Sequence, residues 1–226
     1  MQIQHRHDWN LTPSEAIALQ KRLAAEIDYH HPIDLAAVRL VAGVDVSVKT
    51  DPVSGQANSQ AAVVVLSYPQ LTIVETSLAQ MPTPFPYISG LLSFREGPVL
   101  EKAFEKLQAE PDVLIFDGMG RMHPRRIGIA SHMGLWLQKP TIGCGKTKLL
   151  GHFAEPDAER GGRSDLIDHD EVLGVVLRTR TNVKPVYISV GHLADLETSV
   201  ELTLRCTSKY RLPDPIRAAH NAAGAF

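Results

Sequence analysis

The sequence predicts an α/β protein in which a mixed β-sheet, built from an antiparallel three-strand meander and parallel strands, is flanked by helices. Two observations support this class. Three β-rich runs follow one another with short connections in the first half, and short apolar strands alternate with helical segments in the second half. Short connections favour antiparallel pairing, whereas strand–helix–strand units favour parallel strands with helices on both faces of the sheet. We expect a single domain over residues 1–226, because this length supports one large core and no shift in composition divides the chain.

The first predicted element is a helix that begins at Pro13. Thr12 and Glu15 have the spacing of a capping box, and proline is favoured at the first helical position. Apolar residues from Ile17 to Ile27 follow at roughly helical spacing. We therefore expect this helix to end near residues 30–32, the sequence HHP.

Three β-rich runs follow this helix and are predicted to pair as the antiparallel meander. They are VRLVAGVDVSVK from Val38, QAAVVVLSY from Gln60 and LTIVETSLA from Leu71. Turn-forming residues separate these runs, namely Asp51-Pro52, Gly55 and Pro69.

The second half is predicted to begin with a helix at Pro98, whose Leu100, Phe104 and Leu107 share one face. Short apolar runs after it are expected to form buried strands in a parallel α/β order. The expected strands are residues 112–117, 140–145, 171–179 and 185–191, and the expected helices are residues 127–137 and 196–206. Residues 154–170, AEPDAERGGRSDLIDHD, are expected to form a polar surface loop.

The bulk composition excludes several classes of protein. The chain has 23 Lys and Arg against 25 Asp and Glu, so no global positive charge indicates a nucleic-acid partner, although a local patch is compatible with this balance. Two cysteines, Cys144 and Cys206, are too few for a disulfide framework or a zinc site. The sequence contains no signal peptide and no apolar run long enough to span a bilayer. We expect a soluble, cytoplasmic protein that is not associated with a membrane.

Three acidic residues fall at unusual places in the predicted elements. Asp45 lies inside the apolar run VAGVDVSV, where burying a carboxylate is costly without a compensating partner. Asp117 ends the strand VLIFD before a glycine-containing turn, and Glu96 follows the apolar run of PYISGLLSFRE. Each also fits an ordinary structural role: a solvated sheet face for Asp45, a loop cap for Asp117 and an ion pair with Arg95 for Glu96. If the strand that ends at Asp117 lies beside the strand that carries Asp45, the two carboxylates can approach each other.

Carboxylates gathered from separate elements favour a hard divalent cation, Mg²⁺ or Mn²⁺ rather than zinc, because their charges otherwise repel. Such a group is typical of metal-assisted phosphodiester hydrolysis. Lys146, after the next buried strand, adds a cation that can neutralise a phosphate, and an ordinary surface lysine is the alternative. The run Gly145-Lys146-Thr147 is not a P-loop, because Pro140 stands where the first glycine should be.

Positively charged and histidine side chains are concentrated in GMGRMHPRRIGIASH, between Asp117 and Lys146. They are Arg121, His123, Arg125, Arg126 and His132. Cations and backbone N–H groups around a helix start can hold phosphates. A solvated basic helix end is the alternative, but the position beside the acidic residues favours a polyanionic substrate.

Four motifs, in their order and spacing, resemble the endonuclease V family of deoxyinosine 3′-endonucleases. They are VAGVDVS, PYISGLLSFRE, FDGMGRMHPRRIGIASHMG and PTIGCGKTKLLG, and the resemblance extends from about Val38 to the closing YRLPDPIRAAH. It implies a ribonuclease H-like fold, in which the strands of Asp45 and Asp117 are neighbours. It also implies cleavage of the second phosphodiester bond 3′ to a hypoxanthine nucleotide, which leaves a 3′-hydroxyl and a 5′-phosphate. The implied cofactor is Mg²⁺, with Mn²⁺ able to substitute.

The resemblance also implies roles for individual residues. The implied catalytic set is Asp45, Glu96 and Asp117 as metal-binding acids, Lys146 as the catalytic lysine, His123 near the active site and His220 beside the metal and the attacking water. A plain surface histidine is the alternative for His220. The implied wedge, which inserts at the lesion, is Pro86, Tyr87, Ile88 and Ser89, and the implied pocket for the flipped base is Gly90, Leu92, Gly118, Ile129 and Gly145. Many bacterial members have proline at the position of Ser89, so the stiffness of this wedge is open.

The function expected from these observations is that of a monomeric nuclease that nicks DNA containing deoxyinosine. A base must leave the stack to be inspected, and an aromatic and proline wedge can fill the gap that it leaves. Backbone donors and acceptors can then reject adenine in favour of hypoxanthine. Inosine-containing RNA is an alternative substrate, and a catalytically inactive inosine-binding module is an alternative of another class. A soluble α/β domain with scattered surface acids does not explain four motifs in register.

Overall fold

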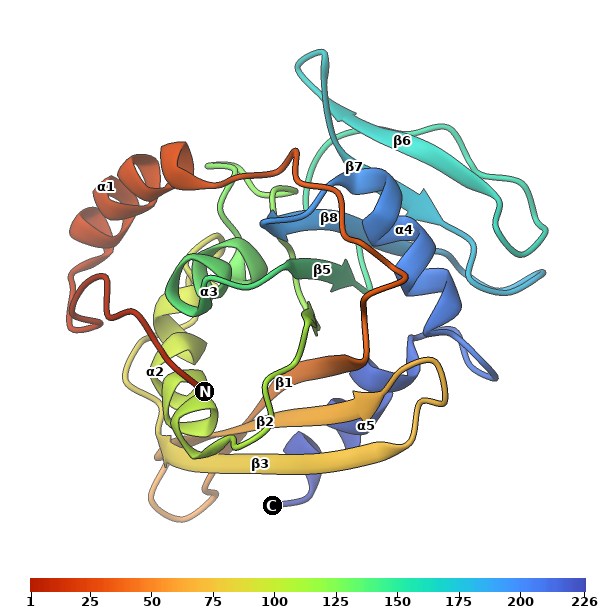
Figure 1. Cartoon of the computed structure of the whole chain (residues 1–226). Helices are drawn as coiled ribbons and strands as arrows, with labels where there is room; N and C mark the ends of the chain where they lie inside the picture. Colours follow the sequence, from red (N-terminus) through yellow and green to blue (C-terminus); the bar gives the residue numbers. More distant parts are fainter.

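A computed structural model describes residues 1–226 and contains one eight-stranded sheet with helices on both faces (Figure 1). The strand order is β3-β2-β1-β4-β5-β8-β7-β6. In chain order the elements are α1 (Pro13–Leu23), the 3₁₀ helix η1 (Ala24–Glu26), β1 (Leu40–Thr50), β2 (Ala57–Ser67), β3 (Ile73–Pro82), α2 (Leu92–Lys106), β4 (Val113–Phe116), α3 (Ile129–Leu137), β5 (Thr141–Gly145), β6 (Arg163–Asp168), β7 (Glu171–Leu177), β8 (Val186–His192), α4 (Leu196–Arg205) and α5 (Asp214–Gly224). The predicted class, a mixed sheet flanked by helices, is confirmed. No helix of the structure has both the length and the apolar character needed to cross a bilayer.

The centre of the sheet is the part that positions chemistry. β1, β2 and β3 form the predicted antiparallel meander, and β4 pairs in parallel with β1 on one side and with β5 on the other. The expected adjacency of the strand that carries Asp45 and the strand that precedes Asp117 is therefore confirmed.

The parallel order does not continue beyond β5, so this part of the prediction is wrong. β8 is antiparallel to β5, and β7 and β6 add further antiparallel pairs at that edge. For the pair of β7 and β8, the reason lies in their connection, residues 178–185, which contains no helix. Such a short connection returns the chain in the opposite direction, whereas a parallel pair needs a longer crossover.

Two apolar layers bury the faces of the sheet. α2 and α3 pack against one face, where Phe104 and Trp136 lie in the same buried cluster as Val63 and Phe116. α4 and α5 cover the other face (Figure 1). α1 packs beside the start of α2 in a smaller cluster. Burial on both faces explains why the central strands are almost continuously apolar.

Two helices differ from their predicted bounds. α1 ends at Leu23, not near residues 30–32, because a 3₁₀ turn follows and Ile27 reaches the core from extended backbone. α2 begins at Leu92, not at Pro98. Phe94 is fully buried in the first turn, and its burial outweighs the backbone hydrogen bond that Pro98 cannot donate. Glu96 consequently lies on a helix and not on a connector.

Two further elements were not predicted. β6 lies within the expected surface loop, and it pairs with β7 through the two-residue turn His169-Asp170, in which both residues have positive φ. As an edge strand, β6 buries only Leu166, so its sequence is too polar to be distinguished from a loop. α5 follows Pro213 and buries Ile216 and Ala219.

Candidate active site

The parallel pairing of β1 with β4 brings Asp45 and Asp117 together just after the last residue pair of their ladder. Val44 and Phe116, which precede the two acids, are opposite each other in the ladder, and the N–H of Asp117 donates to the carbonyl of Val44 at 2.8 Å. A carboxylate oxygen of each acid and a ring nitrogen of His220 all lie within 4.8 Å of one another. Three elements, β1, the end of β4 and α5, thus contribute to one polar group.

His220 reaches this group because α5 lies directly on β1. A Cβ atom at Gly43 would be 1.9 Å from the carbonyl oxygen of Pro215, so the close approach of the helix requires glycine at this position of the strand. The Nδ1 atom of His220 lies 2.8 Å from Oδ2 of Asp45. His220 is therefore not an isolated surface histidine, although its side chain remains about half exposed.

Lys146 follows β5, the strand next to β4, and its Nζ atom lies 2.5 Å from Oδ2 of Asp117. The acid is mostly buried, while the lysine side chain is 36% exposed. The ammonium group therefore stands between the buried carboxylate and the solvent, where an anion can approach it.

Glu96 lies near the two aspartates on α2 but is not part of the group within 4.8 Å. Burial raises the pKa of its carboxyl group to about 8, and the charges of Asp45 and Asp117 contribute to this rise. Arg95 does not pair with Glu96; its guanidinium donates to the carbonyl of Phe85 at 2.7 Å. The ion pair with Arg95 is therefore not formed, and the glutamate is a third acid near the other two.

The electrostatics of this group fit a divalent cation. Burial raises the pKa of Asp45, and the negative charge of Asp117 adds to this effect. A cation between the carboxylates would remove this repulsion, and carboxylate oxygens are the ligands that Mg²⁺ and Mn²⁺ prefer. Asp45 and Asp117 are therefore suited to hold such an ion, with Glu96 as the third acid near them and the ring of His220 beside Asp45.

A cavity of about 310 Å³ opens beside the acids. Its lining includes all five residues expected around a flipped base, together with Tyr87 and Ser89 of the expected wedge and three residues of the expected catalytic set. These are Gly90, Leu92, Gly118, Ile129 and Gly145, then Tyr87 and Ser89, and finally Asp117, His123 and Lys146. Two residues of the expected wedge do not line it: Pro86 is exposed and Ile88 packs against the cluster under α1.

Close contacts explain why the cavity wall is built from glycine. A Cβ atom at Gly118 would be 2.7 Å from Cγ2 of Ile129, and one at Gly145 would be 2.2 Å from Cε of Met119. Side chains at these positions would displace their neighbours and fill the cavity. The wall therefore presents backbone N–H and C=O groups to whatever enters.

The segment 86–90 is anchored at its end through the carbonyl of Gly90, whose φ of 79° is in the left-handed region. This oxygen accepts hydrogen bonds from Nε2 of Gln20 at 3.1 Å, from Nε2 of His123 at 3.0 Å and from Nη2 of Arg125 at 2.6 Å. Gln20 was not expected at the site, and Arg125 was expected to hold phosphates and not this carbonyl. A polar residue on the buried face of α1, among Ala16 and Leu23, is the sequence signal that could have identified Gln20.

His123 is a neutral link in this anchor. Burial lowers the pKa of its imidazole to about 4, with a further contribution from the charge of Arg125. Its Nδ1 atom accepts the backbone N–H of Arg125 at 3.2 Å, which leaves Nε2 as the protonated nitrogen that donates to Gly90. Both ring nitrogens are thus used within the protein.

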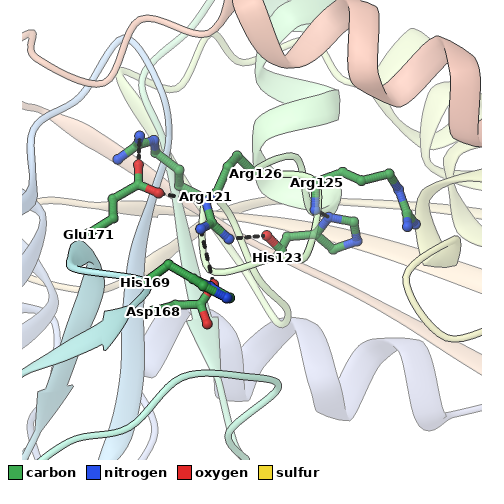
Figure 2. A network of polar contacts seen from close by, with 7 residues as sticks. All are labelled: Arg121, His123, Arg125, Arg126, Asp168, His169 and Glu171. Atoms are coloured by element: carbon green, nitrogen blue, oxygen red, sulfur yellow. Dashed lines mark hydrogen bonds and ion pairs between the residues drawn. The ribbon is translucent and has the colours of Figure 1, made fainter.

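The arginines of the basic segment 118–132 are engaged within the protein, so the expectation that they hold phosphates is not supported. Figure 2 shows that Arg121 and Arg126 both point to Glu171 at the end of the β6–β7 hairpin. Arg126 also lies 3.0 Å from Oδ2 of Asp168 and donates to the carbonyl of His123 at 3.1 Å. The hairpin was not predicted, so its acids could not be foreseen as partners.

The same segment contains His132, which is fully buried and lies 2.7 Å from the ring of His7, measured between their Nε2 atoms. Burial lowers the pKa of His132 to about 3, and His7 adds to this effect. His132 is therefore a core residue.

Comparisons with known proteins agree with this geometry. The family model described as Endonuclease V matches residues 21–221. An Endonuclease V of Methanothrix thermoacetophila is 48% identical over 214 residues, which cover 95% of this chain and 92% of the relative. The crystal structure of the Endonuclease V from Bacillus subtilis is similar with a TM-score of 0.95 and 32% identity, and the match covers 99% of this chain and 96% of that one.

A third similar protein was solved with nucleic acid. It is the Endonuclease V of Ciona intestinalis in complex with a 24mer DNA containing an inosine followed by a ribo-adenosine, and it has a TM-score of 0.79 and 29% identity over 93% of this chain and 95% of that one. The mixed sheet described above is accordingly the ribonuclease H-like sheet of these nucleases. This chain belongs to the endonuclease V family of nucleases.

Proposed function

We propose that this protein recognises deoxyinosine in DNA and hydrolyses the second phosphodiester bond 3′ to it, leaving a 3′-hydroxyl and a 5′-phosphate. The observation that carries the proposal is the junction of two features: the glycine-walled cavity and the group of Asp45, Asp117 and His220 meet at Asp117 and Lys146. The Ciona intestinalis relative supports it, because that protein was solved with DNA containing inosine.

The cavity is suited to discriminate between bases. Hypoxanthine differs from adenine by a carbonyl oxygen and a protonated ring nitrogen, so backbone groups around Gly118 and Gly145 that pair with hypoxanthine are left unpaired by adenine. Tyr87 is 75% exposed at the rim of the cavity. Its ring fills the gap that the flipped base leaves in the stack.

Asp45, Asp117 and Glu96 would hold Mg²⁺, with Mn²⁺ able to substitute. When bound, the ion supplies positive charge that activates water and stabilises the leaving oxygen. The nuclease reaction therefore depends on the metal.

The side chains of the protein bind the strand and orient the reactants. The ammonium of Lys146 attracts the phosphate next to Asp117. His220, held by Asp45 through Nδ1, keeps Nε2 free to orient the attacking water. The water oxygen bonds to phosphorus and releases a proton to solvent while the bond from phosphorus to the 3′ oxygen breaks, and the leaving 3′ oxygen takes up a proton from solvent to form the 3′-hydroxyl.

The proposal is tested with matched single-stranded oligonucleotides that contain deoxyinosine, inosine in RNA, or adenine at one position, each incubated with Mg²⁺ or with EDTA. We expect cutting of the deoxyinosine strand with Mg²⁺ only. If the deoxyinosine and adenine strands stay equally intact, the proposal fails.

Inosine-containing RNA is the second candidate substrate. It is favoured by one observation, since the DNA bound to the Ciona intestinalis relative carries a ribo-adenosine after the inosine. Preferential cutting of the RNA strand in the same experiment would support it. An inactive binding module is less well supported, because Asp45, Asp117 and Lys146 are all present and in contact range. The expectation that the protein is a monomer stays a prediction.

A further inference from the structure

A second cavity, of about 440 Å³, adjoins the first along the segment 146–148. Lys146, Thr147 and Lys148 line both cavities. Beyond this shared wall, the second cavity is lined by the cations Lys184 and Arg211 and the aromatic rings of Phe153 and Tyr187. An extended ligand that passes over Lys146 can therefore occupy both cavities.

Of the cations in this second cavity, Lys146 is paired with Asp117, whereas the others have no acidic partner in the protein. Lys148 and Lys184 form no ion pair in a chain whose overall charge is −2. The one acid in the lining, Glu155, lies 2.7 Å from Nη2 of Arg178, a mostly buried arginine outside the lining. The contrast with Arg121 and Arg126 is direct, because those two arginines are paired with acids of the β6–β7 hairpin.

Arg211 adds a fixed positive charge. Its Nη2 atom donates to the carbonyls of Lys146 at 2.7 Å and Pro185 at 2.6 Å, which ties the segment after β5 to the start of β8. Its Nε atom is buried and has no hydrogen-bond partner in the protein. The guanidinium of Arg211 lines the cavity and pairs with carbonyls and no acid, so its positive charge favours an anionic ligand there.

The aromatic rings form a stacking surface beside these cations. The ring centroids of Phe153 and Tyr187 lie 5.9 Å apart with planes at 70°, and Nζ of Lys148 is 5.7 Å from the Phe153 centroid. Cations that follow a backbone, combined with aromatic faces for the bases, are typical of sites for single-stranded nucleic acid.

We propose that this second cavity binds the part of the strand that lies 3′ of the cleaved bond, with phosphates at Lys148, Lys184 and Arg211 and a base against Phe153 or Tyr187. This inference rests on the proposed function, since it takes the first cavity as the pocket for the lesion and Lys146 as the place of the cleaved phosphate. The 5′ part of the strand makes no use of this surface.

The test compares binding of two deoxyinosine oligonucleotides in EDTA, by fluorescence anisotropy. In one oligonucleotide the nucleotides 3′ of the lesion (the 3′ arm) end at the bond that would be cleaved, and in the other they continue well beyond it. A matched pair carries adenine in place of hypoxanthine. The wild-type protein is expected to bind the oligonucleotide with the long 3′ arm more tightly.

Lys184→Ala should lose most of the affinity gained from the long 3′ arm, with the slope of log Kd against log salt reduced by about 0.7, the value for one phosphate on a single strand. Phe153→Ala should lower long-arm affinity by about fivefold or more through lost stacking.

Lys102→Ala is the matched control, because Lys102 is a lysine on α2 outside both cavities. Lengthening the 5′ arm should affect wild type and Lys184→Ala equally. If Lys184→Ala and Phe153→Ala both keep the full gain from the long 3′ arm while deoxyinosine is still preferred to adenine, the second cavity is not the strand site. If wild type shows no preference for deoxyinosine but the arm effect is present and lost in the variants, the proposed lesion specificity fails and the cavity remains a single-strand site.

Discussion

Asp117 is the residue at which the cavity and the acidic group meet. Its carboxylate lies 2.5 Å from Nζ of Lys146, belongs to the group within 4.8 Å with Asp45 and His220, and lines the cavity. Taken alone in the sequence, it is equally compatible with a cap on a loop. The pairing of β1 with β4 distinguishes the two roles, because only the partner strand places a second carboxylate beside it.

Replacing this carboxylate tests its proposed role as a metal ligand. Asp117→Ala should reduce cutting of a deoxyinosine strand by at least about 100-fold, because the loss of a ligand removes several kcal/mol of charge stabilisation. Binding of the lesion, measured in EDTA, should change only a few fold. Asp165→Ala, an exposed acid on β6, is the control. Full cutting activity in Asp117→Ala would contradict the assignment.

Tyr87 is exposed, so its proposed role can be separated from stability. Tyr87→Ala should leave the melting temperature unchanged and weaken binding of a deoxyinosine strand by about fivefold or more, since one stacked ring is lost. Tyr87→Phe keeps the ring and should bind as the wild type does. An unchanged dissociation constant for Tyr87→Ala would exclude the ring as a wedge.

His123 gives a pH dependence with a definite sign. Its pKa falls from 6.5 to about 4 on folding, so the folded protein holds the imidazole neutral. The stability that this provides is present above pH 6.5 and is lost as the pH falls through 4, with a total of about 3 kcal/mol. His123→Gln has no titrating ring but keeps a side-chain N–H for Gly90.

The measurement is chemical denaturation of wild type and His123→Gln across that pH range. We expect the free energy of unfolding to fall less steeply toward acid pH in the variant. The pKa of His132 is lowered mainly by burial, which is the same in both proteins, so most of its contribution cancels in the comparison. Parallel pH profiles for the two proteins would show that His123 does not act as a neutral anchor.

At the scale of elements, the β6–β7 hairpin holds the loop between β4 and α3. Glu171 pairs with Arg121 and Arg126, and Arg126 in turn contacts the carbonyl of His123 (Figure 2). Since His123 donates to Gly90, the hairpin is linked through two hydrogen bonds to the segment that carries Tyr87. An edge hairpin thereby contributes to the position of the expected wedge.

Glu171→Ala removes the partner of both arginines. It should lower the free energy of unfolding by about 1 kcal/mol, a value at the upper end for partly exposed pairs because two ion pairs are lost. It should also weaken binding of a deoxyinosine strand relative to an adenine strand. Glu201→Ala, which breaks an exposed pair with Arg205 on α4, should leave that binding ratio unchanged. Equal binding ratios for the two variants would contradict a link between hairpin and wedge.

The elements also show what could be predicted from the sequence and why the rest could not. β2, β4 and β5 are recognisable because buried strands are almost continuously apolar. β6 is not recognisable, because this edge strand buries a single residue. The predicted start of α2 is misplaced because Pro98 favours a helix start locally, whereas the burial of Phe94 depends on tertiary contacts. Local patterns do not report either effect.

The residues of the candidate site likewise fall into those that the sequence predicts and those that it does not. Asp45, Asp117 and Lys146 follow or interrupt apolar strands, so their unusual positions are visible in the sequence. The contact of His220 with Asp45 depends on the packing of α5 against Gly43, and the pairing of Arg126 depends on the hairpin. Contacts between elements far apart in the chain carry no local signal, which is why the sequence does not reveal that arginines of the basic segment are already paired.

At the scale of the whole molecule, one continuous sheet joins the parts that the proposed reaction needs. Its parallel centre sets Asp45 within β1 beside Asp117 at the end of β4, α5 adds His220 from one face and α2 adds Glu96 from the other (Figure 1). The two cavities lie on either side of the segment after β5. Lesion recognition, cutting and release of the strand would thus all take place beside the carboxyl ends of the central strands β4 and β5.

The most direct test of this arrangement is the position of the cut in a 5′-labelled DNA strand with a single deoxyinosine, mapped at nucleotide resolution with Mg²⁺. The account predicts one product that ends with a 3′-hydroxyl one nucleotide beyond the lesion, and no product with EDTA. A cut at the lesion itself, cuts at random positions or an undiminished reaction in EDTA would contradict it.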